Sequence, residues 1–161
     1  MTSEGVVALL GDSIIDNKVY VGKNELSVTE HLEANSDFNY EMIAVDGDTT
    51  KEVIDNQLEK IRANTSHIVL SIGGNDLLQK LYIMTNQTSG MVQALEIASK
   101  TVEEIKTRYE EILVHLKTLN HPVLLCTIYE GDLQSDPNLA EVEEAGKVME
   151  PLFTFSQMLP S

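Results

Sequence analysis

Four short apolar runs, separated by stretches with helical periodicity, constrain the fold of this chain more than any other feature. The runs are Val6–Leu10, Tyr40–Val45, His67–Ile72 and Val123–Tyr129. Each run is almost continuously apolar, which is typical of parallel strands covered on both faces. Three intervening stretches are expected to form helices: Leu26–Ala34, Lys51–Arg62 and Met91–Leu119. This alternation predicts an α/β protein, a three-layer sandwich around a parallel sheet.

Capping residues mark two of the predicted helix boundaries. Thr49 or Thr50 is expected to cap the second helix, because a hydroxyl can accept a hydrogen bond from an amide of the first turn. Glu52 places a negative charge beside that turn, where the helix dipole favours it. The long helix is expected to end in the Asn120-His121-Pro122 stretch, because proline disfavours helix at the preceding residue.

The long helix carries apolar residues in steps of three and four, which permits two interpretations. The residues are Leu95, Ala98, Val102, Ile105, Tyr109, Ile112, Leu116 and Leu119. They form either a seam for a partner helix or one side of a helix that lies on the sheet. Only about three and a half heptads are present, and alanine and tyrosine are poor seam residues. We therefore favour packing on the sheet.

Length and charge limit the classes of partner. The chain of 161 residues suits a single domain, and we expect residues 1–161 to form one. The formal net charge is −15, from 26 acidic and 11 basic side chains. This charge repels nucleic-acid backbones and anionic membranes, so neither is an expected partner. A neutral small-molecule substrate suits such a field, and a carboxylate product would leave it readily.

Several other classes of site are excluded by missing residues. The turn after the first predicted strand contains only Gly11, whereas a dinucleotide site needs three glycines. Gly22-Lys23-Asn24 does not match a phosphate-binding loop. The four histidines are scattered and Cys126 is the single cysteine, so we predict no metal site, no cofactor and an inert core thiol. The N-terminus lacks signal-peptide features, so a cytoplasmic location is expected.

Polar and glycine-containing motifs follow three of the predicted strands. They are Gly11-Asp12-Ser13, Asp46-Gly47-Asp48 and Gly73-Gly74-Asn75-Asp76. In open parallel sheets, functional groups gather at the carboxyl ends of the strands. Each motif alone is typical of an ordinary turn. Their order at successive strand ends indicates a shared site.

These residue types match the requirements of acyl transfer. Ser13 offers a hydroxyl nucleophile and a backbone N–H, and Gly47 offers an N–H that no Cβ obstructs. Asn75 offers a side-chain amide, which the tight turn at Gly73-Gly74 aims. Three such donors can surround the oxyanion that forms when a hydroxyl attacks an ester carbonyl.

The three motifs resemble the signature blocks of the SGNH/GDSL-type hydrolases, a family of esterases and lipases. LLGDSIIDN resembles the first block, with Ser13 at the nucleophile; AVDGDTT places Gly47 at the glycine of the second; SIGGNDLL places Asn75 in the third. Asp12, Gly74 and Asp76 are supporting residues of these blocks. The resemblance covers Val6 to Tyr129 and implies a flavodoxin-like sheet and a serine hydrolase acting on acyl or acetyl esters.

The last block of that family, Asp-x-x-His, has no counterpart here. The histidines are His31, His67, His115 and His121, and none has an aspartate three positions before it. Two fall on predicted helices and two precede or open strands, away from Ser13, so the general base is unknown. Asp12, Asp16 and Asp76 are poor substitutes, because an ordinary aspartate has a pKa of about 3.9.

The sequence after Tyr129 shows no fifth apolar run. Leu139–Met149 is expected to form only an acidic, weakly amphipathic helix. We therefore expect a C-terminally truncated hydrolase domain with four visible strands. Two alternatives stay open beside ester hydrolysis: a catalytically impaired binding protein that keeps the pocket, and an interaction module that uses the Met91–Leu119 helix. The oligomeric state is not predicted.

Overall fold

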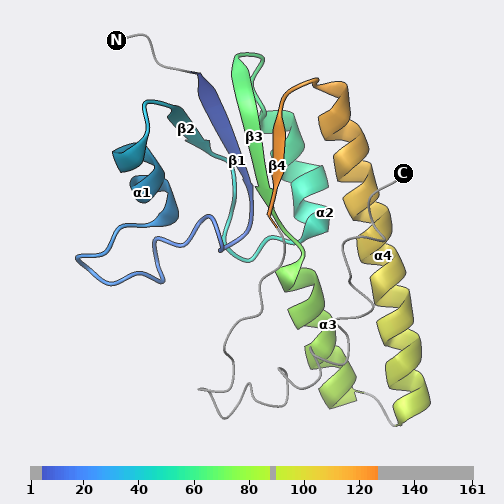
Figure 1. Ribbon diagram of the computed structural model, residues 1–161. Helices are drawn as coiled ribbons and strands as arrows, with labels where there is room; N and C mark the ends of the chain where they lie inside the picture. The colour runs from blue at the N-terminus through green and yellow to red at the C-terminus, as the bar shows by residue number, and fades with distance from the viewer. Residues whose placement is uncertain (1–4, 88–89, 127–161) are drawn as a thin grey trace.

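The computed structural model describes residues 5–87 and 90–126, which form a parallel sheet with helices on both faces (Figure 1). The four strands of this part lie in the order β2-β1-β3-β4. Their bounds are β1 Val6–Gly11, β2 Asn39–Met42, β3 Thr65–Ser71 and β4 Val123–Leu125. Leu9 of β1 lies opposite Met42 on one side and Val69 on the other. The predicted parallel α/β sheet is confirmed.

Two strands are shorter than the apolar runs that predicted them. β2 ends at Met42, because the amides of Ile43 and Ala44 both turn to the carbonyl of Leu9, at 2.9 and 2.8 Å. β4 ends at Leu125, and the rest of the run to Tyr129 lies outside the described residues. The predicted helix at 139–149 also lies outside them.

Alternation along the strands divides the core into two layers. On one face, buried residues of β1 and β3 such as Leu10 and Leu70 pack with the helix α4 (Met91–Thr118), which contributes Ile112 and Leu116. On the other face, Leu9 packs with residues that include Leu32 of α1 (Val28–Asn35). Figure 1 shows α1 on one side of the sheet and α2 (Thr50–Glu52) and α4 on the other. The result is the flavodoxin-like three-layer sandwich expected from the sequence.

The first helix, α1 Val28–Asn35, begins two residues later than predicted. Ser27 precedes it in extended conformation and accepts a hydrogen bond from the amide of Glu30. The Glu30 carboxylate accepts one from the Ser27 amide in return, at 2.7 Å. This reciprocal capping box satisfies two amides that the helix itself leaves unpaired, and it sets the helix start.

The second predicted helix is helical but not a continuous α-helix. It consists of α2 Thr50–Glu52, a π-helical turn η1 Val53–Gln57 and a 3-10 turn η2 Leu58–Lys60. Thr49 is the capping residue, paired reciprocally with Glu52, while Thr50 is fully buried. The π turn ends at Gln57, whose side chain is buried and bonded to the end of β1. Single π turns of this kind often occur at functional sites.

One helix is absent from the sequence prediction. α3 Gly74–Gln87 begins inside the motif that we expected to be a turn. Its partner is the amino-terminal part of α4, which it meets through long-range contacts that include Lys80 and Glu104, at 3.9 Å. Two glycines beside an asparagine and an aspartate indicate a turn locally, and packing against α4 overrides that local preference.

The long helix, α4 Met91–Thr118, lies on the sheet as favoured. Ile105, Tyr109, Ile112 and Leu116 are buried, whereas Leu95 near the amino end is 62% exposed. The helix terminates before Asn120, which adopts the left-handed conformation at φ 56° that commonly ends helices. In the described part of the chain, no helix combines the length and apolar character needed to cross a membrane.

Candidate active site

The three sequence motifs lie at one edge of the sheet, which we call the carboxyl rim and define as residues 11–16, 43–50 and 71–76. Backbone bonds join its segments: the Asp12 amide donates to the Ser71 carbonyl at 3.2 Å, and the Val45 amide donates to the Gly11 carbonyl at 3.1 Å. The Asn75 side chain donates to the Asp48 carbonyl at 2.9 Å. The structure therefore brings the three motifs together.

Gly11 makes the close approach of β1 and β3 possible. Its φ is +134°, and a Cβ at this position would lie 1.8 Å from the Ser71 carbonyl oxygen. No other residue fits here, because both the space and the backbone conformation exclude a side chain. Gly11 thus brings the chain out of the sheet directly before Asp12 and Ser13.

Ser13 stands in a tight turn that Asp12 organises. The Asp12 carboxylate accepts a hydrogen bond from the Ile14 amide at 3.0 Å, and its carbonyl accepts from the amides of Ile15 and Asp16. Asp12 is buried, and burial raises its pKa, to which the nearby carboxylates of Asp76 and Asp46 add. Ser13 itself is half-buried. Asp12 therefore holds the backbone of the turn that carries Ser13.

The Ser13 amide has no acceptor among the described residues. Every other amide from residue 11 to residue 16 donates a hydrogen bond to a described group: Gly11 to Gln57, Asp12 to Ser71, Ile14 to the Asp12 side chain, and Ile15 and Asp16 to the Asp12 carbonyl. The amide predicted to bind the oxyanion is thus the one that this turn leaves open.

The β2–α2 loop shows the same pattern around Gly47, which is exposed with a φ of +86°. Amides on both sides of it are paired within the described structure: Ile43, Ala44, Val45, Asp46, Asp48, Thr49 and Thr50 all donate. The Gly47 amide has no acceptor there. A Cβ on Gly47 would meet nothing within 4 Å, so the backbone conformation, rather than crowding, is what favours glycine.

Asn75 lies in the first turn of α3, next to the glycines of its motif. One N–H of its side-chain amide donates a hydrogen bond to the Asp48 carbonyl. The second N–H has no acceptor among the described residues. Gly73 has a φ of +118°, which lets the chain turn from β3 into the helix. Gly74 has free space around its Cβ position, so the structure shows no steric need for glycine there.

Asp76 ties three elements together at the rim. Its buried carboxylate accepts hydrogen bonds from the Thr50 amide at 2.8 Å and the Thr50 hydroxyl at 2.6 Å. The Arg108 guanidinium of α4 approaches it at 3.4 Å. Both oxygens of the Asp76 carboxylate are therefore engaged by described partners, and they join α3 to Thr50 and to Arg108.

Gln57 is a residue of the site that sequence reasoning missed. It is fully buried, accepts a hydrogen bond from the Gly11 amide and donates to the Gly11 carbonyl, both at 2.8 Å. It also donates to the Asp48 carboxylate at 2.7 Å. Gln57 therefore joins the segment that carries Ser13 to the loop that carries Gly47. No motif marks it, because the π turn that ends at this residue has no recognised sequence signal.

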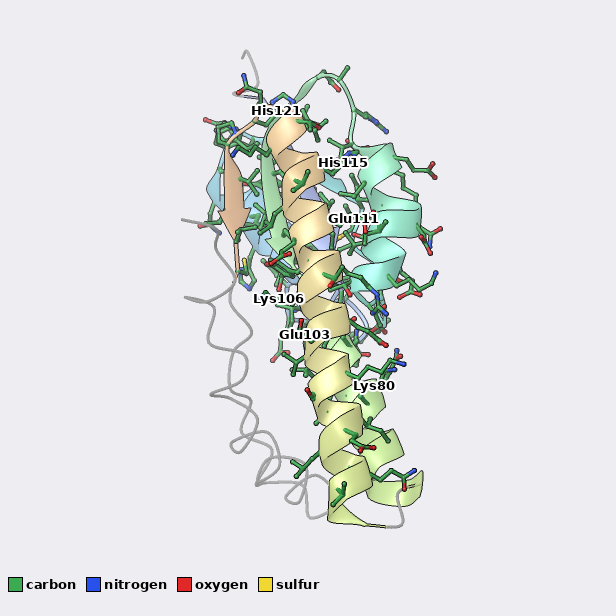
Figure 2. The ribbon with its side chains drawn as sticks, turned by 90° about the vertical axis from the view of Figure 1, so that its right-hand side faces the viewer. Lys80, Glu103, Lys106, Glu111, His115 and His121 are labelled. Atoms are coloured by element: carbon green, nitrogen blue, oxygen red, sulfur yellow. The ribbon has the colours of Figure 1, made fainter. Side chains whose placement is uncertain are left out.

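None of the four histidines belongs to the rim segments, and two of them were expected on the side of the sheet away from Ser13. His31 is on α1, and His67 lies opposite Val7, in the amino-terminal half of β3 and beside Phe38. Figure 2 shows His115 and His121 at one end of α4 and Lys80 of α3 toward the other. Because α3 begins at the rim, His115 and His121 are at the opposite edge of the sheet.

Cys126 differs from its prediction, because it is half-buried and not a fully enclosed core thiol. It follows β4, which is an edge strand of the described sheet. Burial, with a smaller contribution from Cys126, raises the pKa of the Tyr109 hydroxyl to about 12.

Within the described residues, no group of three or more histidine, cysteine, aspartate or glutamate side chains is arranged to hold a metal ion.

Comparison with solved structures places the fold among bacterial and metagenomic esterases and lipases. The lipase Lip_vut3 from a goat rumen metagenome superposes with a TM-score of 0.68 at 19% identity, over 97% of this chain and 76% of that one. Phospholipase A1 from Streptomyces albidoflavus NA297 gives 0.57 at 15% identity, over 96% and 76%. A GDSL-like lipase from Parabacteroides merdae ATCC 43184 gives 0.50 at 18% identity, over 96% and 77%.

These similarities show that the chain has the fold of the SGNH/GDSL-type hydrolases. Identities of this size establish the fold alone and not the reaction. Neither a scan against models of protein families nor a search of curated proteins finds a match to the sequence.

Proposed function

We propose that this chain is a serine ester hydrolase in which Ser13 is the nucleophile. The Ser13 amide, the Gly47 amide and the Asn75 side-chain amide would bind the oxyanion. The observation that carries the proposal is the pairing pattern of the rim: within residues 11–16 and 43–50, only the amides of Ser13 and Gly47 lack a described acceptor. Folded proteins pair most of their amides, and an oxyanion site needs open ones.

In the proposed reaction, the Ser13 hydroxyl oxygen forms a bond to the ester carbonyl carbon. The bond from that carbon to the alcohol oxygen then breaks, and the proton lost by Ser13 leaves with the alcohol. A water molecule attacks the acyl-enzyme in the same manner, which releases a carboxylic acid and restores the hydroxyl. Each step uses the same oxyanion donors.

The general base of this reaction is not assigned. The carboxylates of Asp12, Asp16 and Asp76 are already engaged. They accept hydrogen bonds from the amides of Ile14, Asp46 and Thr50, respectively. None of the four histidines lies at the rim. Without a base, a serine triad retains only about 10³–10⁴-fold acceleration over water. The lack of an assigned general base among the described residues favours a second candidate function, an ester-binding protein with impaired turnover.

The interaction-module alternative is weakened by the packing of α4. The residues that would form its central seam, Ile105, Tyr109, Ile112 and Leu116, are buried within the chain. They are therefore not available to a partner helix in the folded protein.

A fluorophosphonate probe tests the proposal at its central residue. We expect labelling of Ser13, identified by peptide mapping, and loss of that label in Ser13→Ala. Ser66→Ala is a matched control, because Ser66 is half-buried at the amino end of β3 and bonds to the Val6 carbonyl. Equal labelling, and equal hydrolysis of p-nitrophenyl acetate, by the chain and by Ser13→Ala would favour the binding protein instead.

The oxyanion role of Asn75 makes a quantitative prediction. Asn75→Ala should lower the rate of ester hydrolysis by about 10²–10³-fold, as the loss of one oxyanion donor does in other serine hydrolases. Binding of a substrate analogue should change much less. An effect below about threefold in rate would remove Asn75 from the oxyanion site.

A further inference from the structure

Large apolar side chains are exposed within three residues, along the chain, of each of the three proposed oxyanion donors. Ile14 follows Ser13 and is 46% exposed; Val45 precedes Gly47 by two residues and is 42% exposed. Leu78 is 50% exposed and follows Asn75 by three residues on α3, which places the two on the same side of the helix. We call Ile14, Val45 and Leu78 the rim patch.

Hydrogen bonds hold the three segments of the rim patch together. The Asp16 carboxylate, in the turn that carries Ile14, accepts from the Asp46 amide at 3.0 Å, directly after Val45. The Asp48 carbonyl, in the Val45 loop, accepts from Asn75 of α3 at 2.9 Å. The three apolar side chains therefore come from segments that are joined to one another at the carboxyl rim.

The loop after the Ser13 turn carries further exposed apolar side chains. Val19 and Tyr20 are 77% and 67% exposed, and Leu26 is exposed as well. The Tyr20 hydroxyl donates to the Asp46 carboxylate at 2.9 Å, which fixes the loop to the rim. Among the described residues, six of the eleven large apolar side chains that are exposed lie in these segments. Such clustering is typical of a binding surface.

Charge around the patch restricts its ligand. Asp12, Asp16, Asp46 and Asp48 lie within the rim segments, and the whole chain carries −15. A carboxylate or phosphate ligand would be repelled from such a surface, as would an anionic membrane. An uncharged molecule with a hydrocarbon portion meets no such barrier.

We infer that the rim patch binds the hydrocarbon acyl chain of an uncharged ester, so that the site acts on acyl groups of several carbons in preference to acetyl. This inference rests on the proposed function, because it places the ester carbonyl at Ser13. Complete burial of one methylene is worth about 0.8 kcal/mol, or about fourfold. Covering about half of each methylene on an exposed surface would give roughly twofold in kcat/KM per added methylene.

Hydrolysis of p-nitrophenyl acetate, butyrate and octanoate tests the inference. We expect kcat/KM for octanoate to exceed that for acetate by about 10–100-fold, from six added methylenes at the value above. Val45→Thr keeps the side-chain shape and Leu78→Gln keeps helix propensity, and each should lower the octanoate-to-acetate ratio about two- to fivefold. Val114→Thr is the matched control, because Val114 is 66% exposed on α4, away from the rim, and should leave the ratio unchanged.

The outcomes separate this inference from the proposed function. If acetate is hydrolysed as fast as octanoate, or if the rim variants leave the ratio unchanged, the inference is wrong and ester hydrolysis stands. If no ester is hydrolysed, the proposed function fails. Binding of a fluorescent, uncharged monoacylglycerol to Ser13→Ala, measured by anisotropy, then decides the inference: weakening by Leu78→Gln and not by Val114→Thr supports it, and equal affinity overturns it.

Sedimentation with phosphatidylcholine vesicles identifies the competing explanation. If the chain binds these vesicles, loses that binding in the rim variants and shows no preference for acyl length in solution, the patch is a lipid-surface contact and the inference is overturned. Thermal unfolding of each variant confirms that the folded state is retained.

Discussion

The core beneath α4 and the carboxyl rim are stabilised by different interactions. In the core, Leu10, Leu70 and Ile112 bury apolar surface. At the rim, an extensive set of hydrogen bonds surrounds two backbone amides, those of Ser13 and Gly47, that have no acceptor in the described structure. The difference teaches that the rim is held by hydrogen bonds placed around particular open donors, whereas the core is held by apolar packing.

The largest expected effect on stability comes from the core. Ile112 is fully buried in the cluster between the sheet and α4, so Ile112→Ala should lower the free energy of unfolding by about 2–5 kcal/mol. Val114→Ala, at an exposed position on the same helix, should change it by less than about 0.5 kcal/mol. Denaturant titration measures both. The rate of Ser13 labelling in the folded Ile112→Ala protein should be unchanged; a large loss would show that the two regions are not independent.

Gln57 is the residue where the two regions meet, and its removal should affect both. Gln57→Leu leaves the Gly11 amide and carbonyl without their side-chain partner, which should cost about 2–3 kcal/mol of unfolding free energy. Hydrolysis at Ser13 should also slow, because the segments of Ser13 and Gly47 lose the connection through Gln57 and keep only the Val45–Gly11 and Asp46–Asp16 hydrogen bonds. Asn56→Leu, at an exposed position of the same π turn, is the control. Unchanged hydrolysis in folded Gln57→Leu would show that Gln57 only stabilises the fold.

The smallest expected effect is a pH dependence from Asp12. Burial raises the pKa of this carboxyl above its ordinary value, so the folded state binds its proton more tightly than the unfolded state. The ionised form therefore costs stability, and its cost develops as pH rises from the ordinary aspartate pKa through the raised one. Asp12→Asn keeps an acceptor for the Ile14 amide and removes this charge. Its stability relative to the unmodified chain should improve between pH 3 and pH 7; a constant difference would contradict the raised pKa.

Local patterns predicted most of the architecture. The apolar runs located all four described strands, and the three-to-four spacing in α4 located its buried side, because these signals depend on neighbours within one element. The Thr49 cap was predicted only as one of two choices, and the burial of Thr50 against Asp76 decided between them. The sequence did not predict α3. The glycines at its start indicate a turn locally, and the packing of α4 beside it is visible only in the tertiary structure.

The sequence by itself determined the parallel sheet, the order of its motifs and the residue types at each strand end, because alternation and motif spacing are properties of short segments. Only the tertiary structure decided which rim amides have no acceptor among the described residues, that Gln57 and Asp76 bind the rim segments, and that Ile14, Val45 and Leu78 are exposed. Those features depend on where distant segments approach one another. A hydrogen bond between distant segments forms only when the fold brings donor and acceptor together. Whether a side chain is exposed likewise depends on which segments the fold packs against it.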